Sequence, residues 1–500
     1  MRTIITPIAF FCCLAASAQN ITLNGQFGYE GFTYVENTTS VRKIALNPDG
    51  SIISAGNKSV SGGSNIVLTK HDAGGIQDLT FGSNGIAFTA ISVADEVRDI
   101  QLQADGKILV SGSTYTGSDS GPGVPILHAF VVRYHPNGVI DSSFATNGIF
   151  RVTDYNQSEF SSIIVQSDES LRLIGYSDNI TYMTKLTSAG MLDSSFGTNG
   201  YRALSDQSTF FFFNSGSIRL NDGSILSYGL GDTGLSNPKF TCIKTDASGD
   251  LITSFGQNGI TTIDFSSDPN SLETVSKAQE LPDGRIVLAG ETISKALIRL
   301  KADGTLDSTF ATNGILVHSL PYMDMVVQPN GKILIGGSRE FAQFNWGIVI
   351  SRFNTDGTID NSFNTTGSFE CDFSTGFETM GCMILTAPDR LLVGGKTDFI
   401  QNTSDFLLTE IDMSQSLNLQ TNQSDKVTLY PNPVSDELTI SVSDESITSI
   451  QLTDASGRLI SSHVPEKHTS LSLAHLPAGL YQVIFVNDAQ ERISKKLIKQ

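Results

Sequence analysis

The chain has 500 residues, of which 32 are basic and 51 are acidic, and its formal net charge is −19 at pH 7. A balance this acidic excludes binding of nucleic acid through a general basic surface, because phosphates need lysine and arginine partners. The 46 glycines and 29 phenylalanines, together with few apolar patterns of helical period, favour an all-β fold.

Residues 1–18 have the pattern of a secretory signal peptide. Arg2 supplies the positive start, Ile4–Ala15 is a short apolar run, and the small residues 16–18 match a cleavage site. We expect cleavage after Ala18, so that the mature chain begins at Gln19. The apolar run is too short to cross a membrane and no later stretch reaches about 18 apolar residues, so no transmembrane segment is expected.

A Phe-Gly-x-Asn-Gly motif recurs along most of the chain. Counting variants, it occurs seven times, successive copies lie 52 to 63 residues apart, and the first phenylalanine and the closing glycine are kept in every copy. A period of this size indicates stacked copies of one supersecondary unit that cannot bury its apolar face alone. The copies begin at Phe27, Phe81, Phe144, Phe196, Phe255, Phe310 and Phe363.

Each repeat predicts four antiparallel strands, which in the best-formed copy are residues 86–88, 97–103, 107–112 and 129–134. Asp105-Gly106 predicts a two-residue hairpin turn, because Asp and Gly tolerate positive φ at low cost. Seven such copies predict an all-β, seven-bladed β-propeller, with an open solenoid as the alternative. The first strand of the first repeat and the last strand of the seventh are both present, so we expect no spare strand to clasp the ring.

A second regularity surrounds the end of the fourth strand. In five copies a basic residue there is followed eight residues later by an aspartate, which predicts an ion pair that fixes the turn into the next blade. A catalytic site would be unique rather than copied, so these pairs and the motif phenylalanines are predicted to be structural. The pairs are Lys70–Asp78, Arg133–Asp141, Lys185–Asp193, Arg299–Asp307 and Arg352–Asp360.

These motifs resemble the delta-60 repeat family of bacterial β-propellers. Leu306-Asp307-Ser308-Thr309-Phe310 and Leu281-Pro282-Asp283-Gly284-Arg285 carry the family signature, and the resemblance covers about residues 23–412. It implies the propeller fold and carries no activity. We therefore assign residues 19–412 to the propeller and the polar stretch 413–426 to a linker.

Residues 427–500 alternate in short strands separated by turns, which predicts a small immunoglobulin-like β-sandwich. They resemble the C-terminal sorting domain of the type IX secretion system of Bacteroidota. The resemblance implies the secretion machinery as the partner of residues 427–500, with export followed by release or attachment to the cell surface. A sandwich that binds glycan or spaces the propeller is the alternative. The matching residues include Tyr430, Pro431, Asn432, Pro433, Gly457, Gly479, Leu480, Tyr481, Lys495 and Lys496.

Removal of the signal peptide leaves three cysteines, so the fold must rest on hydrophobic burial rather than on disulfides. Cys371 and Cys382 either pair across neighbouring strands or stay free, and Cys242 is expected to be a buried thiol.

Motifs that carry chemistry are missing from the sequence. It has no His-x-x-x-His or Cys-x-x-Cys pair, no phosphate loop and no nucleophile elbow, so no catalytic residue, cofactor or metal site is predicted. A ligand site is expected among the loops that vary between repeats. The candidate residues are Phe341, Phe344, Asn345 and Trp346, and an exposed cluster of their three aromatic rings would stack on sugars. Alternatively, Trp346 packs within its blade.

The sequence thus favours a secreted, non-enzymatic propeller that binds an extracellular glycan or protein of unknown identity. One alternative is a glycan-cleaving enzyme that uses two carboxylates on the variable loops. The other is a structural component of the cell surface or of adhesion.

Overall fold

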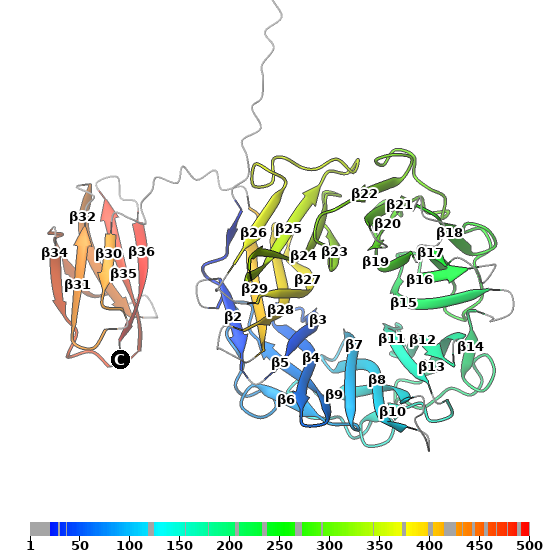
Figure 1. Cartoon of the computed structure of the whole chain (residues 1–500). Helices are drawn as coiled ribbons and strands as arrows, with labels where there is room; N and C mark the ends of the chain where they lie inside the picture. The colour runs from blue at the N-terminus through cyan, green and yellow to red at the C-terminus, as the bar shows by residue number, and fades with distance from the viewer. Residues whose placement is uncertain are drawn as a thin grey trace, which may run out of the picture. The chain divides into compact units, whose positions relative to one another are not determined.

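Figure 1 shows the computed structural model of the chain. It describes residues 21–28, 31–36, 38–118, 125–155, 157–178, 180–205, 210–232, 238–265, 273–291, 294–343, 345–372, 377–398, 404–414, 427–432, 434–442, 446–454, 459–466, 468–477, 479–487 and 492–499. Every regular element within these ranges is a β-strand. None of the described residues forms a helix long and apolar enough to span a membrane. The chain divides into two compact units, Met1–Gln415 and Ser416–Gln500.

The first unit is a succession of four-stranded antiparallel sets arranged around a centre (Figure 1). Apolar residues on both faces of the strands explain why they form, because each set is packed between two neighbours. From the innermost strand outward the first sets are β3 (Ser40–Leu46), β4 (Ile52–Val60), β5 (Gly63–His71), β6 (Ile86–Thr89); β7 (Ala94–Leu102), β8 (Ile108–Ser118), β9 (Pro125–Tyr134), β10 (Ile149–Arg151); and β11 (Ser158–Val165), β12 (Leu171–Ser177), β13 (Ile180–Leu186), β14 (Tyr201–Ala203).

The remaining sets follow the same order. They are β15 (Phe211–Arg219), β16 (Ile225–Asp232), β17 (Lys239–Thr245), β18 (Ile260–Ile263); β19 (Thr274–Glu280), β20 (Ile286–Glu291), β21 (Lys295–Leu300), β22 (Ile315–His318); β23 (Asp324–Val327), β24 (Ile333–Ala342), β25 (Asn345–Phe353), β26 (Ser368–Cys371); and β27 (Thr379–Ala387), β28 (Arg390–Thr397), β29 (Asp405–Asp412) with β2 (Phe32–Val35). Each innermost strand contacts the next one, and β27 contacts β3, so the innermost strands form a closed ring.

The ring is closed by the N-terminal strands, and the prediction that no strand is left to clasp it was wrong. β2 pairs with β29 and completes the last set, and β1 (Thr22–Leu23) also pairs with β29. The reason is an offset between repeat and sheet: the first strand of each sequence repeat is the outermost strand of the preceding sheet, as β6 is for β5. No sheet precedes the first repeat in the sequence, so its first strand, β2, becomes the outermost strand of the last sheet.

The Phe-Gly-x-Asn-Gly motif forms a tight turn that fastens one sheet to the next. In the third copy Phe144 is fully buried, its carbonyl accepts from the Gly148 amide at 2.8 Å, and the Ala145 amide donates to Ala189 of the following repeat at 2.8 Å. Asn147 has φ 54° and Gly148 φ 89°, a region that only Gly and, less readily, Asn adopt at low cost. This backbone requirement explains why glycine closes every copy and why asparagine precedes it in five of the seven.

The copied ion pairs are present and reach across to the next repeat. Arg299 Nε donates to Asp307 at 2.7 Å, its guanidinium lies 4.9 Å from the ring centre of Phe310, and it also donates to the Thr355 carbonyl of the next repeat. These contacts agree with the predicted structural role. The N–O separations in the five pairs are 3.6 Å (Lys70–Asp78), 2.9 Å (Arg133–Asp141), 2.7 Å (Lys185–Asp193), 2.7 Å (Arg299–Asp307) and 2.6 Å (Arg352–Asp360).

The Asp-Gly hairpins differ from the predicted two-residue turn. In the second repeat the Gln103 amide donates to Lys107, the Gly106 amide donates to Gln103, and only Gly106 has positive φ. This is a three-residue connection, a type I turn followed by glycine in the left-handed region. Asp105 contributes its side chain, which accepts from the Lys107 amide at 3.1 Å.

The three described cysteines are buried and free, so the alternative of a Cys371–Cys382 disulfide is not realised. Cys371 lies in β26, the outermost strand of its set, whereas Cys382 lies in β27, the innermost strand of the next. Their side chains pack in different hydrophobic clusters, so the width of a sheet separates them.

The second unit contains two antiparallel sheets. One is β30 (Val427–Tyr430), β31 (Glu437–Val442) and β34 (His468–Ser472); the other is β33 (Leu459–His463), β32 (Ile447–Asp454), β35 (Gly479–Asn487) and β36 (Arg492–Lys499). Residues of both sheets, among them Leu438 and Phe485, share one hydrophobic core. The alternating pattern of the sequence produces this core because every second side chain of a strand points to the same face.

Candidate functional site

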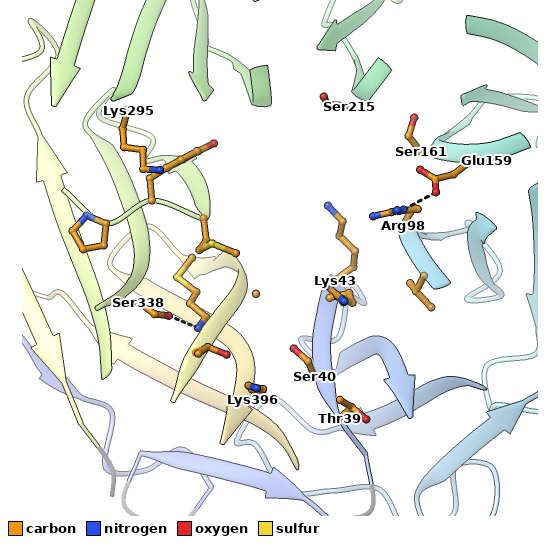
Figure 2. A pocket seen from close by; sticks show the side chains of 18 of the residues that line it. Thr39, Ser40, Lys43, Arg98, Glu159, Ser161, Ser215, Lys295, Ser338 and Lys396 are labelled. Atoms are coloured by element: carbon orange, nitrogen blue, oxygen red, sulfur yellow. Dashed lines mark hydrogen bonds and ion pairs between the residues drawn. The ribbon is translucent and has the colours of Figure 1, made fainter. Parts of the chain in front are cut away.

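A cavity of about 890 Å³ lies at the centre of the ring of strands, a size typical of small-molecule sites. Figure 2 shows its lining side chains converging from different sets: Lys43 from β3, Arg98 from β7, Ser161 from β11 and Lys295 from β21. Residues more than 350 positions apart in the sequence therefore meet in one site.

β-Bulges in the innermost strands place part of the lining. A bulge inserts one extra residue into a strand and redirects its side chain. The register shifts at equivalent points of β3, β7, β11, β15, β19 and β27. The extra residues are Arg42, Arg98, Ser161, Ser215, Ser276 and Gly381, and all of them except Ser276 line the cavity.

A glycine recurs in the strand that pairs with each innermost strand, and it makes room for the bulge. A Cβ atom added to Gly112 would lie 1.8 Å from the Glu96 carbonyl oxygen, and one added to Gly290 would lie 2.0 Å from that of Thr274. Because no larger residue fits, the sequence carries glycine opposite the bulge in β8 and in β20. The recurrent glycine thus supports the shape of the cavity wall.

The cavity is lined by five cationic side chains and one carboxylate, in a chain that is strongly acidic overall. Arg98 Nε lies 2.9 Å from Glu159, which also accepts from the Ser113 hydroxyl at 3.0 Å. Glu96 lies 3.4 Å from Arg98 and 3.9 Å from Arg42. These contacts orient the two guanidinium groups. The cations are Arg42, Lys43, Arg98, Lys295 and Lys396, and the carboxylate is Glu159.

Two of the lysines differ from the other cations. Lys295 pairs with Glu291, but Lys43 and Lys396 are half-buried and form no ion pair within the part of the chain that the structure describes. A partly desolvated ammonium group is unfavourable unless an anion or hydrogen-bond acceptors compensate its charge. Lys43 interacts electrostatically with the buried carboxylate of Asp99, whereas Lys396 has no ion pair among the described residues. With five cations and one carboxylate, the cavity wall keeps an excess of positive charge.

Aromatic rings form another part of the wall. Tyr176 and Phe213 have ring centres 5.0 Å apart at an angle of 36°, and Phe213 is 40% exposed. Burial and then the nearby Glu159 raise the pKa of Tyr176, so its hydroxyl stays protonated. Trp346, which is half-buried, also lines the cavity.

The predicted ligand-binding residues are only partly brought together. Trp346 lies in the wall, whereas Phe341 and Asn345 do not line the cavity: Phe341 packs 5.2 Å from the guanidinium of Arg339, and Asn345 donates to Asp372 at 2.8 Å. Phe344 lies outside the described residues. The basic residues were missed by sequence reasoning, although alignment of the repeats shows arginine at positions 42 and 98 where other copies carry serine or glycine.

A second cavity of about 240 Å³ is smaller, and its charged lining residues are Lys43, Lys277 and Asp324. Lys277 lies 2.9 Å from Asp324, and this carboxylate raises the pKa of Lys277 against the opposing effect of burial. Asp324 accepts from the Met383 amide and Asp99 from the Ile163 amide, each at 2.9 Å, so both aspartates tie neighbouring innermost strands together. Among the described residues no group of three or more His, Cys, Asp and Glu is placed to hold a metal ion.

In the second unit, the residues of the predicted sorting motif mostly support the fold. The Asn432 side chain accepts from the Ile498 amide at 2.9 Å, and the Tyr481 hydroxyl donates to the Pro477 carbonyl at 2.8 Å. Tyr430 is 75% exposed. Gly479, Leu480, Lys495 and Lys496 lie in the paired strands β35 and β36, Pro431 follows β30, and Pro433, Gly457 and Ala18 lie outside the described residues.

Comparison with solved structures gives only distant similarities. A protein of unknown function from Dyadobacter fermentans is 10% identical, with 77% of this chain and all of that chain covered and a TM-score of 0.41. The extracellular domain of the putative hybrid two-component system BT4673 from B. thetaiotaomicron is 10% identical, with 97% of this chain and 59% of that chain covered and a TM-score of 0.38. Sqt1 from Chaetomium thermophilum is 11% identical, with 76% and 98% covered and a TM-score of 0.43.

Comparison with protein families is more informative. No curated protein matches the chain. Residues 428–500 match the secretion system C-terminal sorting domain, and residues 103–144, 281–310 and 328–363 match a domain of unknown function described as the DUF5122 β-propeller. These matches confirm the expected combination of propeller repeats and sorting tail; the delta-60 assignment, the signal peptide and the bacterial phylum stay predictions. The chain therefore carries a DUF5122 β-propeller domain followed by a secretion system C-terminal sorting domain.

Proposed function

We propose that this protein is an exported, non-enzymatic binding protein that holds an anionic extracellular ligand in the central cavity of its propeller. The observation that carries the proposal is the pair Lys43 and Lys396, half-buried in the cavity wall without an ion-pair partner among the described residues. A bound carboxylate, sulfate or phosphate would supply the missing negative charge.

The charge distribution supports a specific site rather than general adhesion. A chain of net charge −19 repels anions over most of its surface. A local excess of cations inside a concave wall would then concentrate an anionic ligand there, because low-dielectric walls focus the field.

The architecture favours the same location. Seven sequence copies and the closed ring of innermost strands support a seven-bladed propeller, and two antiparallel sheets around one core support an immunoglobulin-like sandwich in the tail. The sorting domain indicates export, after which the propeller would act in solution or at the cell surface.

The alternatives have less support. Hydrolysis of a glycan by two carboxylates needs an acid pair about 5–10 Å apart. The cavity wall contributes Glu159, and Glu96 lies beside it, but Arg98 already pairs with both carboxylates. A purely structural surface component would have no use for a cavity wall with five cationic side chains and one carboxylate.

The test is a titration of the full chain with dextran sulfate, polygalacturonate and polyglutamate, at low and at high salt. We expect at least one polyanion to bind and high salt to weaken that binding. The double variant Lys43→Gln, Lys396→Gln should bind it with an affinity lower by at least about tenfold. Lys301→Gln, an exposed lysine outside the cavity, is the matched control. Equal binding by the double variant, or no binding of any polyanion, would refute the proposal, and release of new reducing ends would show an enzyme.

A further inference from the structure

We infer that the ligand of the central cavity is an acidic carbohydrate. A sugar ring stacks on the Tyr176–Phe213 pair while its carboxylate or sulfate group is bound by the neighbouring cations. This inference rests on the proposed function and adds the chemical class of the ligand.

Phe213 occupies a position in the repeat at which an aromatic residue is unusual. It precedes the bulge of β15 by two residues, and the other bulged strands carry only polar or charged residues at that position. An aromatic ring that is 40% exposed at a position otherwise polar gives up hydrophobic burial, which a stacked ligand would restore. The equivalent residues are Ser40, Glu96, Glu159, Thr274 and Thr379.

The second argument is the adjacency of aromatic and cationic groups. Tyr176 stands opposite Glu159 in the β11–β12 pairing, and Glu159 is bound to Arg98 on the next innermost strand. The aromatic pair and the guanidinium group of Arg98 therefore lie in the same part of the cavity wall, where β7, β11 and β15 are neighbours. A ring that carries an anionic substituent has both of these surfaces to bind.

The third argument is the remaining lining, which is rich in hydroxyl groups. A hydroxyl oxygen has two lone pairs, so it can accept from a sugar hydroxyl even where its own hydrogen is donated within the protein, as Ser161 donates to Asn214. An acidic peptide is less well matched: an extended peptide binds by adding a strand to a free edge, and the bulges interrupt the edges of the innermost strands. The hydroxyl side chains are Thr39, Ser40, Ser161, Ser215, Ser338 and Thr379.

The experiment compares matched polymers on the full chain. Polygalacturonate and dextran sulfate are tested beside their uncharged counterparts, methyl-esterified polygalacturonate and dextran, and beside polyglutamate, which has the charge without the sugar. The variants are Phe213→Ala and, as control, Phe88→Ala, a ring that is 46% exposed outside the cavity.

We expect an acidic polysaccharide to bind more tightly than polyglutamate and than its uncharged counterpart. Phe213→Ala should weaken that binding about tenfold, in line with the loss of one stacked ring, and leave polyglutamate binding and the Phe88→Ala control unchanged. Whether polygalacturonate or dextran sulfate binds better distinguishes a carboxylate from a sulfate ester.

Two outcomes separate this inference from the proposed function. If polyglutamate binds as tightly as the acidic polysaccharides and Phe213→Ala has no effect, the carbohydrate inference is wrong and anion binding stands. If none of the polyanions binds, the proposed function fails as well.

Discussion

The turns between successive sheets and the central cavity are two regions of the same repeat, and they use it in opposite ways. At the turns, phenylalanine, arginine and aspartate recur from copy to copy and bind one another and the next repeat. In the cavity, equivalent bulge positions carry arginine in two copies and serine or glycine in the others. In this molecule, the residues that recur in the repeats therefore stabilise the fold, whereas positions at which the repeats differ line the candidate ligand site.

The largest expected effect tests the turns through the motif phenylalanine. Phe255 is 1% exposed and packs against Gly304 of the next repeat, so Phe255→Ala should lower the free energy of unfolding by about 3–5 kcal/mol. Chemical denaturation of the purified protein measures it. Ligand affinity of the folded variant should not change; a loss of affinity without a loss of stability would contradict the separation of the two regions.

The next effect tests the copied ion pair. Burial alone would raise the pKa of Asp360, but hydrogen bonds from Lys332 and Ser362 and the charge of Arg352 lower it to about 2. Asp360→Asn removes the carboxylate charge that pairs with the buried Arg352 and should cost about 3 kcal/mol at neutral pH. The more exposed pair Lys185–Asp193 is the control, since solvent screens its charges and Asp193→Asn should cost less than Asp360→Asn.

The same pair predicts a pH dependence. Because the pKa of Asp360 is lower in the folded state than its ordinary value of 3.8, its stabilisation is present above about pH 4 and is lost as the pH falls toward 2. Unfolding measured across this range should therefore show a shallower acid dependence in Asp360→Asn than in the wild type. Identical slopes would show that the pair does not contribute.

A smaller effect tests the support of the cavity wall. A methyl group at Gly112 would meet the Glu96 carbonyl oxygen at 1.8 Å, so Gly112→Ala should cost about 1–3 kcal/mol through overpacking. Gly25, whose added Cβ would meet nothing within 4 Å, is the control, and Gly25→Ala should change stability by less than about 0.5 kcal/mol. Equal effects of the two changes would show that the space opposite the bulge is not required.

The smallest effect concerns the unpaired lysines themselves. Replacing Lys43 and Lys396 by glutamine removes two half-buried charges without ion-pair partners among the described residues, so the unfolding free energy should stay the same or rise by about 0.5 kcal/mol. Thermal unfolding without ligand measures it. A loss of more than about 1 kcal/mol would place these lysines with the structural residues of the turns.

The repeat, the ion pairs at the turns and the sorting tail could all be predicted from the sequence alone. The spacing of the phenylalanine motif predicts the repeat, the eight-residue offset predicts pairs such as Arg299–Asp307, and the tail carries its own motif. Each of these depends on residues close together in the chain, where spacing fixes geometry. Trp346 is noticeable because it is the only tryptophan in the chain, and its ligand-binding role stays a prediction.

The way the ring closes and the residues that line the cavity could not be predicted from the sequence, because both depend on contacts between distant parts of the chain. β2 pairs with β29 from the opposite end of the first unit, and a pattern of local strands contains no information on that partner. Lys43 and Lys396 each look like an ordinary solvent-facing lysine in a strand. They become a site because the ring brings the innermost ends of distant sheets together, and because bulges and opposing glycines turn the wall toward its centre.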